Sequence, residues 1–271
     1  MEIKPFSPNL GATINNVDLS KGVNKREFET IKKAFLKYQV LFFINQDEIP
    51  PETQISFGKL FGDLHSHPAA PTMKGYPEIF EIHTHKKSKI ANGEFWHSDV
   101  SCDIYPPLGT MLQIHILPDC GGDTMFSNMY KAYDMLSDSF KKMLNNFNAI
   151  HESEHIYKGR YSDRGMQDEA IAMPTATHPI FRTHPETGKK AIYVNRTFTR
   201  SIEGMSDSES KSILNFLFDH CEHVDFQIRY RWNKNDLVFW DNRCAMHRAI
   251  WDYWPNERKG RRVTIKGEKP I

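Results

Sequence analysis

The sequence lacks the features that mark membrane, secreted and nucleic-acid-binding proteins. Its longest apolar run, residues 40–44, is far too short to cross a bilayer, and its first residues form no apolar signal-peptide region. Its four cysteines are widely spaced without a C-x-x-C pair, which argues against a disulfide framework or a zinc knuckle. A net charge of +1 offers no basic surface to nucleic acid or to an anionic membrane. We therefore expect a soluble, cytoplasmic protein with no nucleic-acid or membrane partner.

Internal repeats and low-complexity tracts are also absent, so we expect a single domain over residues 1–271. Helical periodicity and capping residues predict helices at 24–38, 50–62, 129–136, 139–144 and 206–218. Strands are predicted at 40–44, 108–116, 124–127, 180–182, 191–194, 237–240 and 262–265. The polar region 145–172 follows neither pattern. A connection of that length is either functional or partly disordered, and we hypothesise that it is a lid insertion that closes over the pocket.

Four histidines are followed two positions later by an acidic residue, in the pairs His97/Asp99, His184/Glu186, His220/Glu222 and His223/Asp225. Two ligands of one metal ion must point the same way, and in a β-strand residues i and i+2 share a face. Strand-forming residues flank only the first pair, as Phe95, Trp96 and Val100. The second pair falls in the solvated loop of a predicted hairpin, and the last two lie at the end of a helix. The pair His97/Asp99 is therefore the predicted start of a metal site.

A third ligand should come from a distant segment, and the best candidate is His247. It follows a predicted buried strand at 237–240 and a turn at 241–243. Two histidines and one carboxylate form the triad that leaves open positions on non-haem Fe(II), although a lone histidine is more often structural. Further on, Arg258 and Arg262 suit two-pronged capture of a carboxylate or sulfonate, or else form a solvated basic face.

Taken together, these motifs resemble the taurine dioxygenase family, Fe(II)- and 2-oxoglutarate-dependent enzymes that include the aryloxyalkanoate dioxygenases. The resemblance extends from Gly11 to Pro270 with order and spacing kept, and it rests on Trp96-His97-Ser98-Asp99, Gly121-Gly122-Asp123-Thr124, Arg182-Thr183-His184-Pro185, Trp240-Asp241-Asn242-Arg243, His247 and Arg258/Arg262. It implies a mainly β protein, a double-stranded β-helix (jelly roll) with helices packed outside it. It also implies a homo-oligomer, either a dimer or a tetramer.

The resemblance implies a role for each candidate residue. His97, Asp99 and His247 would hold the catalytic Fe(II), and O2 would react there. Thr124 and Arg258 would bind the far carboxylate of 2-oxoglutarate. A small anionic organic substrate would meet His67 and Arg262 beside Val100, although His67 could line the pocket without touching substrate. Positions that carry larger side chains in taurine dioxygenases hold Ala70, Gly93 and Cys102 here, which predicts a roomier pocket.

The predicted reaction is hydroxylation of a sulfonate such as taurine, at the carbon next to sulfur, with release of sulfite. A larger sulfonate or an aryloxyalkanoate carboxylate is the alternative substrate. A zinc hydrolase with the same three ligands would need a general base, and Glu94 would point away from the metal if its segment were a strand. A catalytically silent jelly-roll binding protein is the non-enzyme alternative.

Overall fold

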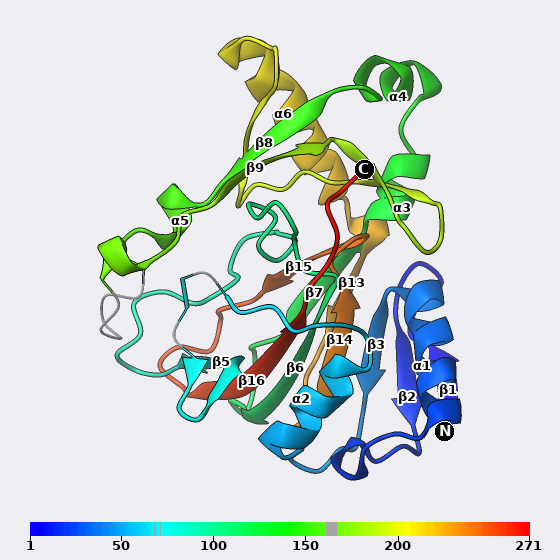
Figure 1. Ribbon diagram of the computed structural model, residues 1–271, viewed down its shortest axis with the longest axis vertical. Coiled ribbons are helices and arrows are strands. Elements are labelled where there is room, and N and C mark those ends of the chain that lie inside the picture. Colours follow the sequence, from blue (N-terminus) through cyan, green and yellow to red (C-terminus); the bar gives the residue numbers. More distant parts are fainter. Residues whose placement is uncertain (68, 71, 161–166) are drawn as a thin grey trace.

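The computed structural model describes residues 1–67, 69–70, 72–160 and 167–271, and an eight-stranded sheet forms its centre (Figure 1). Its strand order is β1 (Glu2–Pro5), β2 (Ala12–Asn15), β3 (Val40–Phe43), β14 (Leu237–Asp241), β6 (Gly109–Ile116), β16 (Arg258–Ile265), β5 (Tyr76–Thr84) and β4 (Thr72–Met73). Neighbouring strands are antiparallel except β2 and β3. The order interleaves strands from both ends of the chain, so segments far apart in the sequence meet at the middle of the sheet.

A second sheet faces the first and closes the β-sandwich. It consists of β13 (Gln227–Tyr230), β7 (Thr124–Asn128) and β15 (Ala245–Ala249), with β7 in the middle. Apolar side chains of both sheets form one buried cluster between them, including Phe42, Val238 and Trp240 from the first and Phe126 and Tyr230 from the second. The chain is thus mainly β with a jelly-roll core, which confirms the predicted fold class.

The strands near the centre of the large sheet are buried on both faces. In β14, Val238 and Trp240 point into the sandwich, while Leu237 and Phe239 pack against the helical layer outside it. That layer is made of α1 (Lys25–Tyr38) and α2 (Pro51–Lys59), and the Phe35 ring of α1 stacks on Phe239 at 4.0 Å. Burial on both faces explains why β3 and β14 read as continuous apolar runs rather than as alternating ones. Both predicted capping boxes, at the starts of α1 and α6 (Asp207–Cys221), are formed.

The middle of the chain forms a separate layer, which Figure 1 shows at the top of the molecule. It contains the sheet of β12 (Thr199–Ile202), β8 (Asn148–Glu152) and β9 (Thr175–Pro179), and the hairpin of β10 (Phe181–Thr183) and β11 (Lys190–Ile192). Its helices are α3 (Met129–Asp134), α4 (Asp138–Leu144), α5 (Glu154–Tyr157) and α6. Short 3-10 helices lie at η1 (Leu19–Lys21), η3 (Asp168–Ala170) and η4 (Val224–Phe226).

Region 145–172, which the sequence left unassigned, begins with strand β8, and β8 pairs with β12 on one side and β9 on the other. Residues 161–166 of that region lie outside the described residues. None of the described helices has the length and apolar character needed to cross a membrane.

Candidate active site

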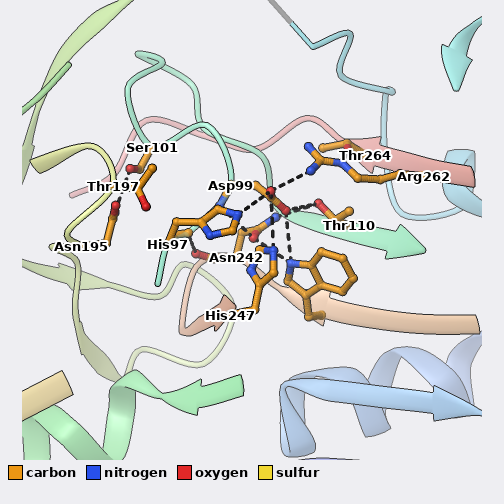
Figure 2. Close-up of polar contacts among 12 residues, drawn as sticks. His97, Asp99, Ser101, Thr110, Asn195, Thr197, Asn242, His247, Arg262 and Thr264 are labelled. Atoms are coloured by element: carbon orange, nitrogen blue, oxygen red, sulfur yellow. Dashed lines mark hydrogen bonds and ion pairs between the residues drawn. The ribbon is translucent and has the colours of Figure 1, made fainter. Parts of the chain in front are cut away.

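Three buried side chains meet at one end of the sandwich. His97 and Asp99 lie in the segment between β5 and β6, and His247 lies on β15. The Nε2 atoms of His97 and His247 lie 3.7 and 3.8 Å from the same oxygen, Oδ1 of Asp99 (Figure 2). The backbones of the two histidines form a β-bridge, in which each N–H donates to the other's carbonyl at 3.0 and 2.9 Å. The structure therefore brings together the three predicted metal ligands, two imidazoles and one carboxylate.

The reason given for that pairing is wrong in one respect, because His97 and Asp99 do not lie in an extended strand. His97 makes only the isolated bridge to His247, and the chain turns at once through Val100, whose φ is 46°. A β-branched residue at positive φ is strained, so the surrounding structure must hold this turn in place. The argument that excluded Glu94 by strand parity fails for the same reason, and Glu94 lines the cavity next to the cluster.

The Asp99 carboxylate is fixed by donors from three strands. Its Oδ2 accepts hydrogen bonds from Thr110 Oγ1 of β6 at 2.8 Å and from Trp240 Nε1 of β14 at 3.2 Å. Its Oδ1 accepts from Arg262 Nη1 of β16 at 2.9 Å. Although burial alone would raise it, the pKa of the Asp99 carboxyl is held well below its usual range, chiefly by the Arg262 guanidinium. The carboxylate thus stays ionised, with Oδ1 facing the histidines.

The two imidazoles are oriented in different ways. Nδ1 of His97 donates to the carbonyl of Phe95 at 2.7 Å, which leaves its Nε2 as the ligand atom. The ring of His247 lies between Trp240 and Phe126, with centroids at 4.6 and 6.1 Å. Burial, reinforced by His97, lowers the pKa of His247 well below its ordinary value. A neutral imidazole is the form that binds a metal ion, so this donor set fits the facial triad of non-haem Fe(II).

One cavity leads from the cluster to the predicted 2-oxoglutarate residues. It has a volume of about 460 Å³, and Thr124 and Arg258 line it together with His97 and His247. Arg258 is only 4% exposed, yet its Nε and Nη2 have no hydrogen-bond partner among the described residues. A buried guanidinium in that state is suited to an anionic ligand.

Trp232, which the sequence analysis missed, contacts two residues that line this cavity. Its Nε1 donates to Thr124 Oγ1 at 3.0 Å, and the Arg258 guanidinium lies 5.5 Å from its ring. Because the Thr124 oxygen is used as the acceptor, its own O–H is directed elsewhere and can donate to an anion. No motif marks this indole. Trp232 follows the end of β13 by two residues, and only the folded structure shows that it reaches Thr124 and Arg258.

A second cavity of about 540 Å³ adjoins the first, with which it shares Asn92, Gly93, His97 and Arg262. His67, Val100 and Arg262 line it, as predicted for the substrate, and so do four residues that the sequence analysis missed: Phe80, Tyr157, Arg160 and Phe198. Nδ1 of His67 accepts from the backbone N–H of Ala69 and Ala70 at 3.1 and 2.9 Å. Burial and the neighbouring Arg262 lower the pKa of His67 well below its ordinary value. The ring is therefore neutral and carries its proton on Nε2, as a donor.

Only one of the three small residues lines this cavity. Gly93 borders both cavities at a φ of 78°, and a Cβ there would lie 3.1 Å from Cε1 of His97. Ala70 and Cys102 belong to the apolar cluster behind the wall, together with Val100 and Tyr157. The extra room expected from small side chains therefore comes directly from Gly93.

A second trio, His184, Asp241 and Cys244, also has metal-ligand geometry. Arg243 donates to both Asp241 oxygens at 2.8 Å, and His184 Nε2 lies 3.1 Å from Oδ2. Burial raises the pKa of the Cys244 thiol well above its ordinary value, so it is not a thiolate. The carboxylate is already paired, and the trio fixes the turn between β14 and β15 that positions His247. The predicted hairpin is formed and its loop is largely exposed, but His184 at the start of that loop is fully buried.

The Thr110 hydroxyl offers a direct test of how the carboxylate is held. We expect Thr110→Val, which keeps the shape and removes the donor to Asp99, to weaken Mn(II) binding about 10- to 100-fold. Exposed Thr177 on β9 provides the matched control, and Thr177→Val should leave the affinity unchanged. Metal titration by calorimetry measures both; equal affinities for the two variants would show that Thr110 does not tune the ligand.

The comparisons with known proteins agree with this geometry. The model of the family described as "Taurine catabolism dioxygenase TauD, TfdA family" matches residues 2–264. An alkylsulfatase of Acinetobacter baylyi is 32% identical over 99% of this chain and 86% of its own, and an alpha-ketoglutarate-dependent sulfate ester dioxygenase of Pseudomonas putida is 29% identical over 100% and 91%. The crystal structure of a taurine dioxygenase from Burkholderia xenovorans superposes with a TM-score of 0.85 at 28% identity, over 100% of this chain and 92% of that one. The chain belongs to the TauD/TfdA family and is a 2-oxoglutarate-dependent non-haem iron dioxygenase.

Proposed function

We propose that this dioxygenase hydroxylates the carbon of a small organic anion that bears a sulfur oxyanion, a sulfonate such as taurine or a sulfate ester. The observation that carries the proposal is the placement of two buried arginines of β16 beside the three-ligand cluster. Arg262 lines both cavities, whereas Arg258 lines only the one that contains Thr124. Strand β16 thus provides one cation for the co-substrate and one for the substrate.

His97, Asp99 and His247 would hold the iron, as their chemistry and mutual distances fit it. Bound Fe(II), with 2-oxoglutarate and O2, supplies the oxidant for C–H hydroxylation, with release of CO2 and succinate. Arg258 binds the far carboxylate of 2-oxoglutarate through a two-pronged hydrogen bond, and the Thr124 hydroxyl donates beside it. These two groups orient the co-substrate along its cavity, toward the ligands.

In the adjoining cavity, Arg262 and the Nε2–H of His67 bind the substrate anion, and Val100, Phe80 and Phe198 enclose its carbon chain. In this structure Arg262 donates a hydrogen bond to Oδ1 of Asp99. The substrate anion and the metal-binding carboxylate therefore share the positive charge of one guanidinium. A carbon hydroxylated next to a sulfonate loses sulfite and leaves an aldehyde. The same hydroxylation of the carbon next to a sulfate ester oxygen releases sulfate. Both substrate classes therefore yield an inorganic sulfur oxyanion, sulfite or sulfate.

The first experiment is succinate production by anaerobically purified, Fe(II)-loaded protein with 2-oxoglutarate and O2. The panel contains taurine, longer alkyl- and arylsulfonates, alkyl sulfates, phenoxyacetate and phenoxypropionate. We expect turnover with the sulfur oxyanions and release of sulfite or sulfate equal to succinate. Turnover with the phenoxyalkanoates alone would establish the aryloxyalkanoate alternative, and turnover with neutral compounds alone would overturn the anion site.

The co-substrate site is tested by Arg258→Gln. Loss of a charge-assisted pair to a buried carboxylate should raise the KM for 2-oxoglutarate about 10- to 100-fold, with a smaller effect on the KM for substrate. Arg231, an exposed arginine directly before Trp232 in the sequence, provides the control. Arg231→Gln should change neither KM. Equal KM values for both variants would place the far carboxylate elsewhere.

We further propose that α5 and the residues after it cover the substrate cavity, which narrows the predicted lid to the described residues 153–160. Ile156, Tyr157 and Arg160 line the cavity, and Arg160 donates to the carbonyl of Ala91 at 2.7 Å and to Asn92 Oδ1 at 3.2 Å. These bonds tie the segment to the loop that carries Gly93.

Arg160→Ala should therefore raise the KM for substrate about tenfold while leaving Mn(II) affinity unchanged. Lys158→Ala removes only an exposed ion pair with Glu154 and serves as the control. In the wild type, substrate with 2-oxoglutarate should slow proteolysis within this segment. Cleavage at the same rate with and without both ligands would rule out the lid.

Two further expectations belong to this proposal. The family resemblance supports a homo-oligomer, and free cysteines at all four positions are in keeping with a cytoplasmic location. The non-catalytic alternative is disfavoured because both arginines and all three ligands lie in place around the two cavities.

A further inference from the structure

A third and larger hollow adjoins the substrate cavity. It lies between α5, β12 and α6, and its volume of about 1,280 Å³ exceeds the 540 Å³ of the substrate cavity. The two hollows share three lining residues, Phe95, Ile156 and Thr197. We name this hollow the α6 groove. Because the same side chains border both spaces, a ligand that passes them leaves the active site and enters the groove.

The shared border lies beside the cluster of metal ligands. The Phe95 carbonyl accepts the His97 Nδ1–H, and Thr197 Oγ1 donates to the carbonyl of Trp96 at 3.1 Å. In Figure 2, Thr197 lies on the His97 side of the cluster and Arg262 on the Asp99 side. A substrate whose anion binds Arg262 and whose chain extends toward Thr197 therefore passes the metal ligands on its way to the groove.

The lining of the groove is amphipathic. Leu214 and Phe218 of α6 form its apolar wall, and Thr199, Ser201 and Ser210 supply hydroxyl groups. A side chain with methylene groups and polar substituents can contact both kinds of surface. The Phe95 ring at the border is 57% exposed, which is unusual for a large aromatic side chain next to an active site and leaves it accessible to a ligand chain.

The charge on the groove is positive. Arg200 and Lys211 are exposed on its rim, and neither makes an ion pair with any residue that the structure describes. Arg196 also lines the groove, but Asp219 and Glu222 pair with it. Asp207 is the one carboxylate among the described residues of the lining. The rim therefore favours an anionic group over a cationic or neutral one.

We propose that the α6 groove binds the far end of an elongated, doubly anionic substrate. This inference rests on the proposed function: the sulfur oxyanion binds Arg262 and His67, the chain passes Phe95 and Ile156, and a second anion such as a carboxylate meets Arg200 and Lys211. The enzyme then selects long bifunctional sulfonates or sulfate esters over short monoanions. The far anion contributes through KM, because it lies away from the reacting carbon.

Three probes and two double variants test the proposal. The probes are a short alkanesulfonate, a long alkanesulfonate and an ω-carboxyalkanesulfonate of the same length as the long one. Arg200→Glu/Lys211→Glu reverses the rim charge, and Arg26→Glu/Lys33→Glu makes the same charge change at exposed positions of α1, on the far side of the large sheet. The KM and kcat of succinate formation are measured for every pair.

In the wild type we expect the ω-carboxyalkanesulfonate to have the lowest KM of the three. The rim variant should raise that KM about tenfold or more and leave the short probe unchanged, while the α1 variant should change neither. Asn215→Trp, at an exposed groove position on α6, should raise the KM of both long probes by filling the space. Calorimetry of the Mn(II)- and N-oxalylglycine-loaded protein gives the same ranking from binding alone.

The proposal is overturned if the rim and α1 variants behave alike, or if the carboxylate at the far end lowers no KM. Wild-type silence on all three probes and on the taurine and alkyl sulfates of the first panel would overturn the proposed function, and the groove assignment with it. Turnover of short and long probes that is insensitive to all groove variants would overturn the groove alone. A change of molecular mass caused by the groove variants would instead identify a second copy of the chain as the occupant.

Discussion

The carboxylate of Asp99 is the point on which the site depends. It is buried in the protein interior, where an unpaired charge would be very costly, and the three side chains that donate hydrogen bonds to it come from three different strands. Thr110 and Trp240 hold one oxygen, while Arg262 and the two imidazoles face the other. The central strands of the large sheet are therefore required to be in register before the carboxylate is satisfied. Correct sheet pairing and a correct metal site are the same structural condition.

Much of the site could be predicted from the sequence, because its key residues lie within recognisable motifs. The triad and both arginines are near one another in the structure as expected. What was missed are residues whose part depends on three-dimensional placement: Thr110, Trp232 and Arg160 lie in no motif, and only the folded chain shows which atoms they contact. A hydroxyl on a mid-sheet strand reads as an ordinary β-forming residue until the carboxylate opposite it is known.

The fold was predicted best where one physical rule dominates. Capping boxes at Asn24 and Ser206 marked both long helices, and continuous apolar runs marked β3 and β14. Sequence patterns failed to predict the structure where tertiary contacts, and not local residues, determine the conformation. In strand β8, burial alternates along the chain but polarity does not, and pairing on both edges defines the strand. The turn at Val100 is held in a strained conformation by its surroundings. His184 likewise lies at the start of a hairpin loop that is largely exposed, as its polar sequence predicts. Its own side chain is buried against Asp241, which the local sequence does not indicate.

The interleaved order of the large sheet has a consequence for how the chain matures. Strand β6, near the centre of the large sheet, lies between β14 and β16. Both of its neighbours therefore come from residues 237–265, far along the chain from β6 itself. Until β14 and β16 are made, β6 has no partner on either edge and β3 is paired only with β2, a state prone to wrong association. Their contacts are also remote in sequence, which makes folding slow compared with proteins of local topology. The metal site is thus completed late, once the segment that carries His247 and Arg262 has paired with the strands made before it, and until then the chain most needs protection from wrong association.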